Sequence, residues 1–283
     1  MEKILRWQVS KSILICGLLE SKQGERVLSQ EEKSRYSRHL MLDDVGEEGQ
    51  EKIRKGSVLI IGCGALGSPN ALYLSGAGVG KIGLVDDDVV DVSNLHRQVM
   101  YRTSDIGISK AQSAKNAIQA LNPDVEVEIY QDRFEVDNAF ELIAGYDFII
   151  DASDNFVTKF LVNQACVLAK KSYAHAGIVR YMGQSMTYYP DCACLGCLFP
   201  IPPKDASLYK MGLFGTLTGI LGSIQASEAL KYFTGVGLPL TNSLLNLDIS
   251  SMSFRKVKIS KNPDCPVCGK NASKTLLALS CNS

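Results

Sequence analysis

A glycine-rich turn between two apolar segments places the strongest constraint on the fold of this chain. The stretch "VLIIGCGALGSPNALYLSGAGVGKIGLVDDD" runs from Val58 to Asp88. It predicts a strand over Val58–Ile61, the turn "GCGALG", a helix over about Leu66–Gly76 and a second strand that ends at Asp86. An all-apolar strand is typical of a sheet covered on both faces, so this order predicts a nucleotide-binding βαβ unit.

The rest of the chain continues the alternation of strands and helices. A polar helix is predicted from Lys110 to Leu121, and the alternating stretch "VEVEIY" predicts a strand over Val125–Tyr130. A helix near Asp137–Ala144, the strand "YDFIID" and another helix follow. The next strands, "SYAHAGI" and "GQSMTYYP", have no helix between them, which favours a mixed sheet in this region. We therefore expect an α/β, Rossmann-like fold with a mixed, mainly parallel sheet flanked by helices.

Capping residues predict a helical segment before the glycine turn and another helix in the last third of the chain. From Ser29 to about Lys55, apolar residues recur at helical spacing, with Ser29 as a candidate N-cap. A helix rich in small residues is predicted over Gly215–Gly235, ended by its last glycine. We expect residues 1–29 to be an N-terminal extension of unknown role and residues 30–283 to form a single domain.

Charge and hydropathy exclude some classes of partner. Lys and Arg together number 30, and so do Asp and Glu, so the formal charge is zero. This balance favours neither a nucleic acid nor an acidic membrane as the main partner. The apolar stretch "SILICGLL" is followed by no small-residue cleavage site, and no apolar run reaches the roughly 18 residues of a membrane span. We expect a cytoplasmic protein without a signal peptide.

The turn itself matches the pattern G-x-G-x-x-G through Gly62, Gly64 and Gly67. Glycines allow the backbone to approach a phosphate, and the following helix presents N–H donors and the positive end of its dipole. An acid at the end of the next strand, here Asp86, can bind ribose hydroxyls. The motif alone is also compatible with a tight turn that holds no ligand.

The residues downstream decide between hydride transfer and ATP chemistry. A dehydrogenase needs a general acid in a second region, and no clear candidate follows the motif. Arg97 and Lys110 can instead hold polyphosphate charge, and Asp154, after the end of a strand, can carry Mg²⁺; Asn94 and Gln98 complete this polar cluster. The ordinary alternatives are a solvated helix surface for Lys110 and a helix N-cap for Asp154.

Four of the nine cysteines form two CxxC pairs. Cys194 and Cys197 lie in "CLGC", and Cys265 and Cys268 lie in "CPVC". In a reducing compartment such pairs indicate a metal clamp, and four sulfurs without an open position make a structural zinc site. The alternative is four reduced surface cysteines.

Several motifs occur in an order that resembles the ThiF/MoeB/HesA family, the bacterial relatives of ubiquitin-activating enzymes. These are "RYSRH", "GCGALGS", "DDDVVDVSNLHRQ", "GISKAQSA", "DASDNFVTK", "CLGCLFP", "GILGSIQASEALK" and "CPVCG". The resemblance covers about Ser29 to Gly269, and "SNLHRQ" together with the two CxxC pairs is its most specific part.

The resemblance implies an adenylyltransferase. Members of the family use ATP to adenylate the C-terminal glycine of a ubiquitin-like sulfur-carrier protein with a Gly-Gly end, in thiamine, molybdopterin or related sulfur transfer. Arg38 would act in trans across a homodimer, and Arg97, Lys110 and Asp154 would complete the catalytic set. The implied ATP-binding residues are Gly62, Gly64, Ala65, Gly67, Asp86, Ser93, Asn94, Leu95, Arg97, Gln98, Lys110, Asp154 and Asn155.

Elementary electrostatics supports this inventory. A carboxylate that attacks an α-phosphate brings two anions together, so the reaction needs cations and correct placement rather than a nucleophilic side chain. Three basic residues and a carboxylate for Mg²⁺ meet that need.

The sequence departs from the sulfur-transferring relatives at one position. Where they carry a reactive cysteine, this chain has Leu208, and no cysteine lies between Cys197 and Cys265. A thioester or persulfide at the usual place is therefore excluded, and Cys192 is only a loose substitute. His175 is expected to be a satisfied core or loop residue rather than a base.

Two other functions stay open. One is adenylation of a peptide C-terminus, as in family members that modify peptide antibiotics. The other is a nucleotide-binding scaffold without activity, which the intact basic and acidic residues argue against. The sequence names neither the carrier, nor the pathway, nor the sulfur donor.

Overall fold

The computed structural model describes residues 27–201 and 212–276 and divides the chain into two units, Met1–Arg35 and Tyr36–Ser283. In the first unit, helix α1 (Gln30–Arg35) follows Ser29. The Ser29 Oγ accepts the Glu32 N–H at 3.1 Å, and the Glu32 carboxylate accepts the Ser29 N–H at 2.7 Å. This reciprocal capping box confirms Ser29 as the N-cap.

The second unit is built on an eight-stranded sheet with the order β3-β2-β1-β4-β5-β6-β7-β8. From β3 to β5 all neighbouring strands are parallel, whereas β5 to β8 pair antiparallel, which confirms the mixed, mainly parallel sheet. The strands are β1 (Ser57–Ile61), β2 (Lys81–Val85), β3 (Glu126–Tyr130), β4 (Phe148–Asp151), β5 (Ser172–Val179), β6 (Met182–Tyr188), β7 (Ser243–Asp248) and β8 (Ser253–Lys258).

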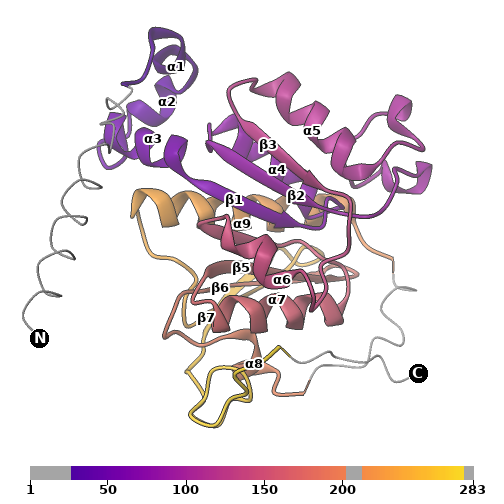
Figure 1. Cartoon of the computed structure of the whole chain (residues 1–283), viewed down its shortest axis with the longest axis vertical. Coiled ribbons are helices and arrows are strands. Elements are labelled where there is room, and N and C mark those ends of the chain that lie inside the picture. Colours follow the sequence, from indigo (N-terminus) through magenta and orange to yellow (C-terminus); the bar gives the residue numbers. More distant parts are fainter. Residues whose placement is uncertain (1–26, 202–211, 277–283) are drawn as a thin grey trace, which may run out of the picture. The chain divides into compact units, whose positions relative to one another are not determined.

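Helices cover both faces of this sheet (Figure 1). One face packs under α4, α5 and α9, and the other packs under α6 and α7. Successive residues of β1 alternate between the two cores, with Val58 and Ile60 in the first and Leu59 and Ile61 in the second. The helices of this unit are α2 (Ser37–Leu40), α3 (Gly46–Lys55), α4 (Gly67–Gly76), α5 (Lys110–Leu121), α6 (Ala139–Ala144), α7 (Phe156–Leu168), α8 (Leu195–Leu198) and α9 (Gly215–Thr234).

Local signals explain where several of these helices begin and end. The Ser109 Oγ accepts the Gln112 N–H at 3.4 Å and caps α5, which begins at Lys110 as predicted. Helix α9 ends at Gly235, whose φ of +75° is the left-handed conformation expected of a C-terminal glycine. The helical segment predicted from Ser29 is broken into three helices, and α3 begins at Gly46 with a φ of +53°.

The strand order sets the position of the site. Strands β2 and β3 lie on one side of β1, and β4 and β5 lie on the other, so the order reverses between β1 and β4. Ligands of open α/β sheets bind at the carboxyl ends of the strands at such a reversal. Within the described residues, no helix is long and apolar enough to cross a membrane.

Candidate nucleotide and metal sites

The glycine turn follows β1 directly at this reversal. Gly62 has a φ of +96°, and a Cβ there would lie 2.8 Å from the Ala152 carbonyl oxygen, on the loop after β4. A Cβ on Gly67 would lie only 2.1 Å from the Gly62 oxygen. On Gly64, by contrast, a Cβ would meet nothing nearer than the Gln98 Nε2 at 3.6 Å. Two glycines are therefore needed by the fold, and Gly64 leaves open space above the turn.

Asp86 ties the turn to the end of β2. Its Oδ2 accepts the Cys63 N–H at 2.7 Å, and its Oδ1 accepts the Asp88 N–H at 2.9 Å. Burial raises the pKa of Asp86, while these two N–H donors and Lys110 oppose the rise. The carboxylate expected to bind ribose therefore also orders the turn below it.

The loop after β2 presents the predicted "SNLHRQ" residues. A short 3-10 turn (Val92–Asn94) is capped by Asp91, which accepts the Ser93 N–H at 2.8 Å and donates its own N–H to the Asn94 Oδ1 at 3.2 Å. Arg97 Nη1 donates to the Ser93 oxygen at 2.8 Å and lies 2.8 Å from His96 Nε2. Its Nη2 and Nε groups make no hydrogen bond within residues 27–201 and 212–276, which leaves them for a phosphate.

Lys110 is buried, which excludes the solvated helix surface as its explanation. Its ammonium donates to the Asp88 Oδ2 at 2.8 Å from the first residue of α5. Tyr101 fixes the same region, because its hydroxyl donates to the Cys63 oxygen at 2.6 Å and lies 3.3 Å from the Lys110 oxygen. A cation is thereby held beside the glycine turn.

Asp154 lies on the loop between β4 and α7, and its carboxylate is exposed. The N-cap of α7 is Asn155, whose Oδ1 accepts the Thr158 N–H at 2.8 Å, so Asp154 is not needed as a cap. The Asn155 Nδ2 lies 3.4 Å from the Asp154 Oδ1. The exposed Asp154 carboxylate is an oxygen ligand that suits Mg²⁺, and the Asn155 amide N–H lies beside it without being a ligand.

The side-chain oxygen of Gln98 is a buried polar atom next to the glycine turn, and it indicates the same nucleotide site. Gln98 is 4% exposed, and its Oε1 has no hydrogen-bond partner within the described ranges 27–201 and 212–276. Buried acceptors are rarely left without a donor, so this amide suits a bound ligand. Ala65 and Leu95 are partly buried in the two loops around it.

Arg38 was also predicted from the sequence as a site residue, but its position differs from that of the other predicted residues. It lies on α2, its side chain is exposed, and its Nη1 is 3.8 Å from Met41 Sδ. The geometry of one chain therefore gives it no contact with the glycine turn among the described residues.

The four CxxC cysteines converge as predicted. The Sγ atoms of Cys194, Cys197, Cys265 and Cys268 all lie within 4.8 Å of one another. The Cys194–Cys265 separation is 3.7 Å and the Cys197–Cys268 separation is 3.4 Å, close to the roughly 3.8 Å between sulfurs of a tetrahedral zinc at about 2.3 Å.

Backbone groups around the cluster stabilise thiolates. The Asn262 N–H donates to the Cys197 Sγ at 3.3 Å, and the Val267 and Cys268 N–H groups donate to the Cys265 Sγ at 3.4 and 3.5 Å. Hydrogen bonds from the Cys194 and Cys268 thiols lower the pKa of Cys197. A Cβ on Gly269 would lie 2.5 Å from the Cys265 oxygen, so glycine is required where "CPVCG" turns.

Sequence reasoning missed several polar residues of the site. His175 is a core residue, but it is only partly satisfied, because its Nδ1 lies 2.7 Å from Asp151 while its Nε2 has no hydrogen-bond partner among the described residues. The Asp151 carboxylate also binds Ser153 and Lys159. The position of Asp151 at the end of the strand in "IIDASDN" could have marked it as a candidate site residue. The sequence contains no signal that pairs Asp151 with Lys159 or His175. Leu208 lies outside the described residues, and Cys192 is half-buried and outside the cysteine cluster.

A glycine turn, an acid after β2 and a second acidic loop, gathered where a parallel sheet reverses its order, define a nucleotide-binding α/β protein. The chain belongs to the ThiF family, whose model matches residues 36–267.

Named relatives agree with this membership. The chain is 45% identical to the sulfur carrier protein adenylyltransferase of Thermus thermophilus, covering 85% of this chain and 92% of the relative. It is 43% identical to the SAMP-activating enzyme E1 of Haloferax volcanii, covering 83% and 88%. Among solved structures, E. coli MccB with ATP superimposes with a TM-score of 0.73 at 24% identity, over 83% of this chain and 74% of MccB, which supports the fold.

Proposed function

We propose that this protein adenylates the C-terminal glycine carboxylate of a small ubiquitin-like sulfur-carrier protein, using ATP and releasing pyrophosphate. The observation that carries the proposal is the contact between two loops at the sheet reversal. Gly62, on the turn after β1, approaches the Ala152 oxygen on the loop that bears Asp154. A triphosphate over the turn would therefore lie beside a carboxylate suited to Mg²⁺.

The residues of the chain take distinct parts in binding. The N–H groups from Gly64 to Gly67 and the start of α4 face the phosphates, because the Gly62 and Cys63 N–H groups already donate within the protein. Asp86 accepts from the ribose hydroxyls. Ser93, Asn94, Leu95 and Gln98 line the nucleotide, with Gln98 supplying its buried acceptor. Ala65 and Asn155 border the phosphates.

The chemical step is an in-line attack of the carboxylate on the α-phosphorus. A bond forms between the glycine oxygen and phosphorus, the bond to the bridging oxygen breaks, and pyrophosphate leaves with the electron pair. Arg97 and Lys110 stabilise the negative charge that accumulates, and Mg²⁺, held by Asp154, supplies further charge neutralisation when bound. No nucleophilic side chain is required.

A homodimer would complete the site. Arg38 is exposed on α2 and makes no contact with the glycine turn of its own chain among the described residues, which is consistent with a role in a second subunit's site. Its guanidinium would add a third cation to the phosphates. The absence of a reactive cysteine at Leu208 is consistent with release of the acyl-adenylate to a separate sulfur donor.

The cysteine cluster is assigned to a structural Zn²⁺. Four sulfurs at tetrahedral spacing leave no open coordination position, so the metal would stabilise the chain rather than catalyse. Residues 1–29 are proposed to precede a single adenylyltransferase domain over residues 30–283.

An ATP–pyrophosphate exchange assay tests the proposal. We expect exchange with a carrier that ends in Gly-Gly and none with a carrier lacking its last glycine. Arg97→Ala and Asp154→Ala should each lower exchange by about 100-fold or more, whereas Lys52→Ala, which removes an exposed cation on α3, should not. Exchange with short peptides but not with the carrier would favour the peptide-modifying alternative. Near-normal exchange by either folded site variant would contradict the assigned roles.

A further inference from the structure

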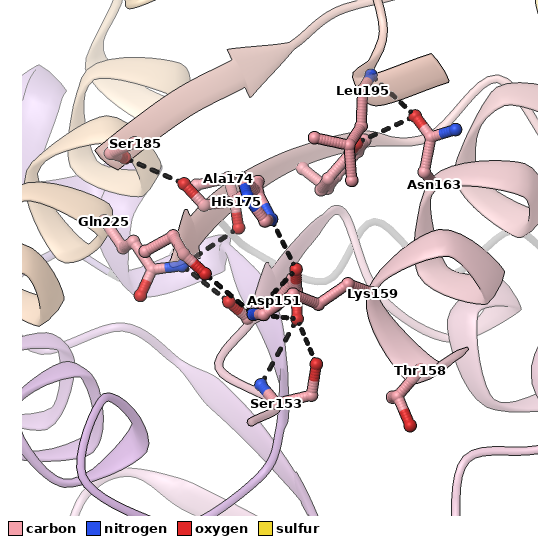
Figure 2. A network of polar contacts seen from close by, with 12 residues as sticks. Asp151, Ser153, Thr158, Lys159, Asn163, Ala174, His175, Ser185, Leu195 and Gln225 are labelled. Atoms are coloured by element: carbon pink, nitrogen blue, oxygen red, sulfur yellow. Dashed lines mark hydrogen bonds and ion pairs between the residues drawn. The ribbon is translucent and has the colours of Figure 1, made fainter. Parts of the chain in front are cut away.

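A buried polar cluster lies directly beneath the Asp154 loop. Its centre is Asp151, the last residue of β4, whose carboxylate is completely buried. Figure 2 shows hydrogen bonds reaching it from the loop, from α7 and from β5. We call Asp151, Ser153, Lys159 and His175 the Asp151 cluster.

Within this cluster, Asp151 binds the residue that precedes Asp154. The Asp151 Oδ1 accepts the Ser153 hydroxyl at 2.6 Å and the Ser153 N–H at 3.2 Å. On the far side, the Asn155 Oδ1 accepts the Thr158 N–H at 2.8 Å. The short loop is therefore fixed on both sides of Asp154, and its carboxylate is presented from a defined backbone.

The carboxylate of Asp151 is itself held from two elements. The Lys159 ammonium, on α7, lies 3.3 and 3.4 Å from its two oxygens and donates to the Ala176 oxygen at 2.7 Å. The His175 Nδ1, on β5, lies 2.7 Å from its Oδ2. Since an isolated buried carboxylate is very unfavourable, these two partners are what keep the anion in place.

The end of β4 and the neighbouring part of β5 are also joined to α4, the helix that follows the glycine turn. The Gln225 Nε2, on α9, donates to the Asp151 carbonyl oxygen at 2.7 Å and to the Ala174 carbonyl oxygen at 3.1 Å. Its Oε1 accepts the Asn70 Nδ2 of α4 at 3.0 Å. Side chains of α4, α9 and α7 thus fix the carboxyl end of β4 relative to the phosphate turn.

We propose that Asp151, held by Lys159 and His175, is a positioning residue that sets the Asp154 carboxylate for Mg²⁺·ATP. In this role Asp151 acts through the Ser153 hydrogen bonds rather than by binding the nucleotide or the metal itself. This inference rests on the proposed function, because it takes Asp154 to be the metal ligand. Groups that hydrogen-bond a metal ligand directly contribute about 10- to 100-fold in metal affinity, and Asp151, which reaches Asp154 through Ser153, is expected at the lower end of that range.

The test measures binding rather than turnover. The affinity of a non-hydrolysable ATP analogue is measured by calorimetry with Mg²⁺ and with a chelator, and the ratio gives the coupling between metal and nucleotide. Ser153→Ala removes the hydroxyl bond to Asp151 and should lower this ratio by about tenfold, while the affinity in chelator stays unchanged. Ser185→Ala is the matched control, because its hydroxyl donates to the His175 carbonyl oxygen at 2.8 Å and does not reach the carboxylate.

A second pair of variants separates positioning from folding. Lys159→Arg keeps the buried cation and should retain the ratio, whereas Lys159→Met should lower it. An unchanged ratio in Ser153→Ala, with a lowered ratio in Asp154→Asn, would overturn the positioning role and leave the proposed function intact. An unchanged ratio in Asp154→Asn would instead refute the metal role of Asp154, and the positioning role with it.

Discussion

Disrupting the cysteine cluster should lower the thermal stability of the protein without removing its nucleotide site. Cys268→Ser takes away one of four sulfurs that lie within 4.8 Å of one another. The cluster joins the helix α8 segment to the chain near Cys265 and lies far along the sequence from the glycine turn. We therefore expect weaker zinc binding and a lower melting temperature, with ATP-analogue affinity retained.

The size of the effect follows from the loop that the metal closes. Cys197 and Cys265 are about 68 residues apart. If the metal is treated as a cross-link, closing a loop of that length lowers the entropy of the unfolded chain and stabilises the folded protein by about 4 kcal/mol at 25 °C. For a protein of this size, about 4 kcal/mol corresponds to a fall in melting temperature on the order of 10 °C.

The melting temperature is measured by calorimetry and the zinc content by metal analysis, on the same samples of wild-type and Cys268→Ser protein. The wild-type chain should carry about one zinc. Cys192→Ser is the matched control, since Cys192 is half-buried like Cys268 but lies outside the cluster. If Cys268→Ser melts with the wild type, or if the folded wild-type protein contains no metal, the structural-zinc reasoning is wrong.

Three further predictions concern the nucleotide site and its supports. Gly67→Ala should destabilise the fold by about 1–3 kcal/mol, because its Cβ would lie 2.1 Å from the Gly62 oxygen, whereas Gly64→Ala should fold normally in denaturant titrations and bind ATP more weakly. Interactions with Lys159 and His175, against the opposing effect of burial, hold the pKa of Asp151 at about 2 rather than 3.8. Its roughly 2 kcal/mol of stability should thus be present above about pH 4 and be lost as pH falls toward 2, a loss that Asp151→Asn would not show in unfolding curves. Mixing inactive Arg38→Ala and Asp154→Ala dimers should restore about a quarter of wild-type exchange through heterodimers with one intact site; no recovery after confirmed subunit exchange would exclude action in trans.

The burial of His175 also predicts a pH dependence of the unfolding free energy, in a higher pH range than the one predicted for Asp151. Burial, with help from the nearby Lys159 charge, lowers the pKa of His175 from 6.5, while its hydrogen bond to Asp151 opposes the shift. Below pH 6.5 the His175 imidazole is therefore protonated in the unfolded chain but stays neutral in the folded chain. The free energy of unfolding should decline as pH falls below 6.5. His175→Gln should flatten the unfolding free energy in that window, and an unaltered slope would contradict this explanation.

The sequence alone determined the features that depend on neighbouring residues. The strand–turn–helix–strand order, the N-cap at Ser29, the start of α5 at Lys110 and the glycine end of α9 follow from local geometry and periodicity, and the structure confirms them. The spacing within each CxxC pair likewise reflects one short turn, and the convergence of the two pairs was predicted from the chemistry of zinc.

Only the tertiary structure decided which distant groups share one environment. Lys110 pairs with Asp88 and is buried, Asn155 rather than Asp154 caps α7, and Asp151 binds Lys159 and His175. Periodicity indicates which side of an element faces a core, but it does not specify strand order. A buried charge finds its partner across strands and helices, so its pairing depends on the packing of the whole sheet.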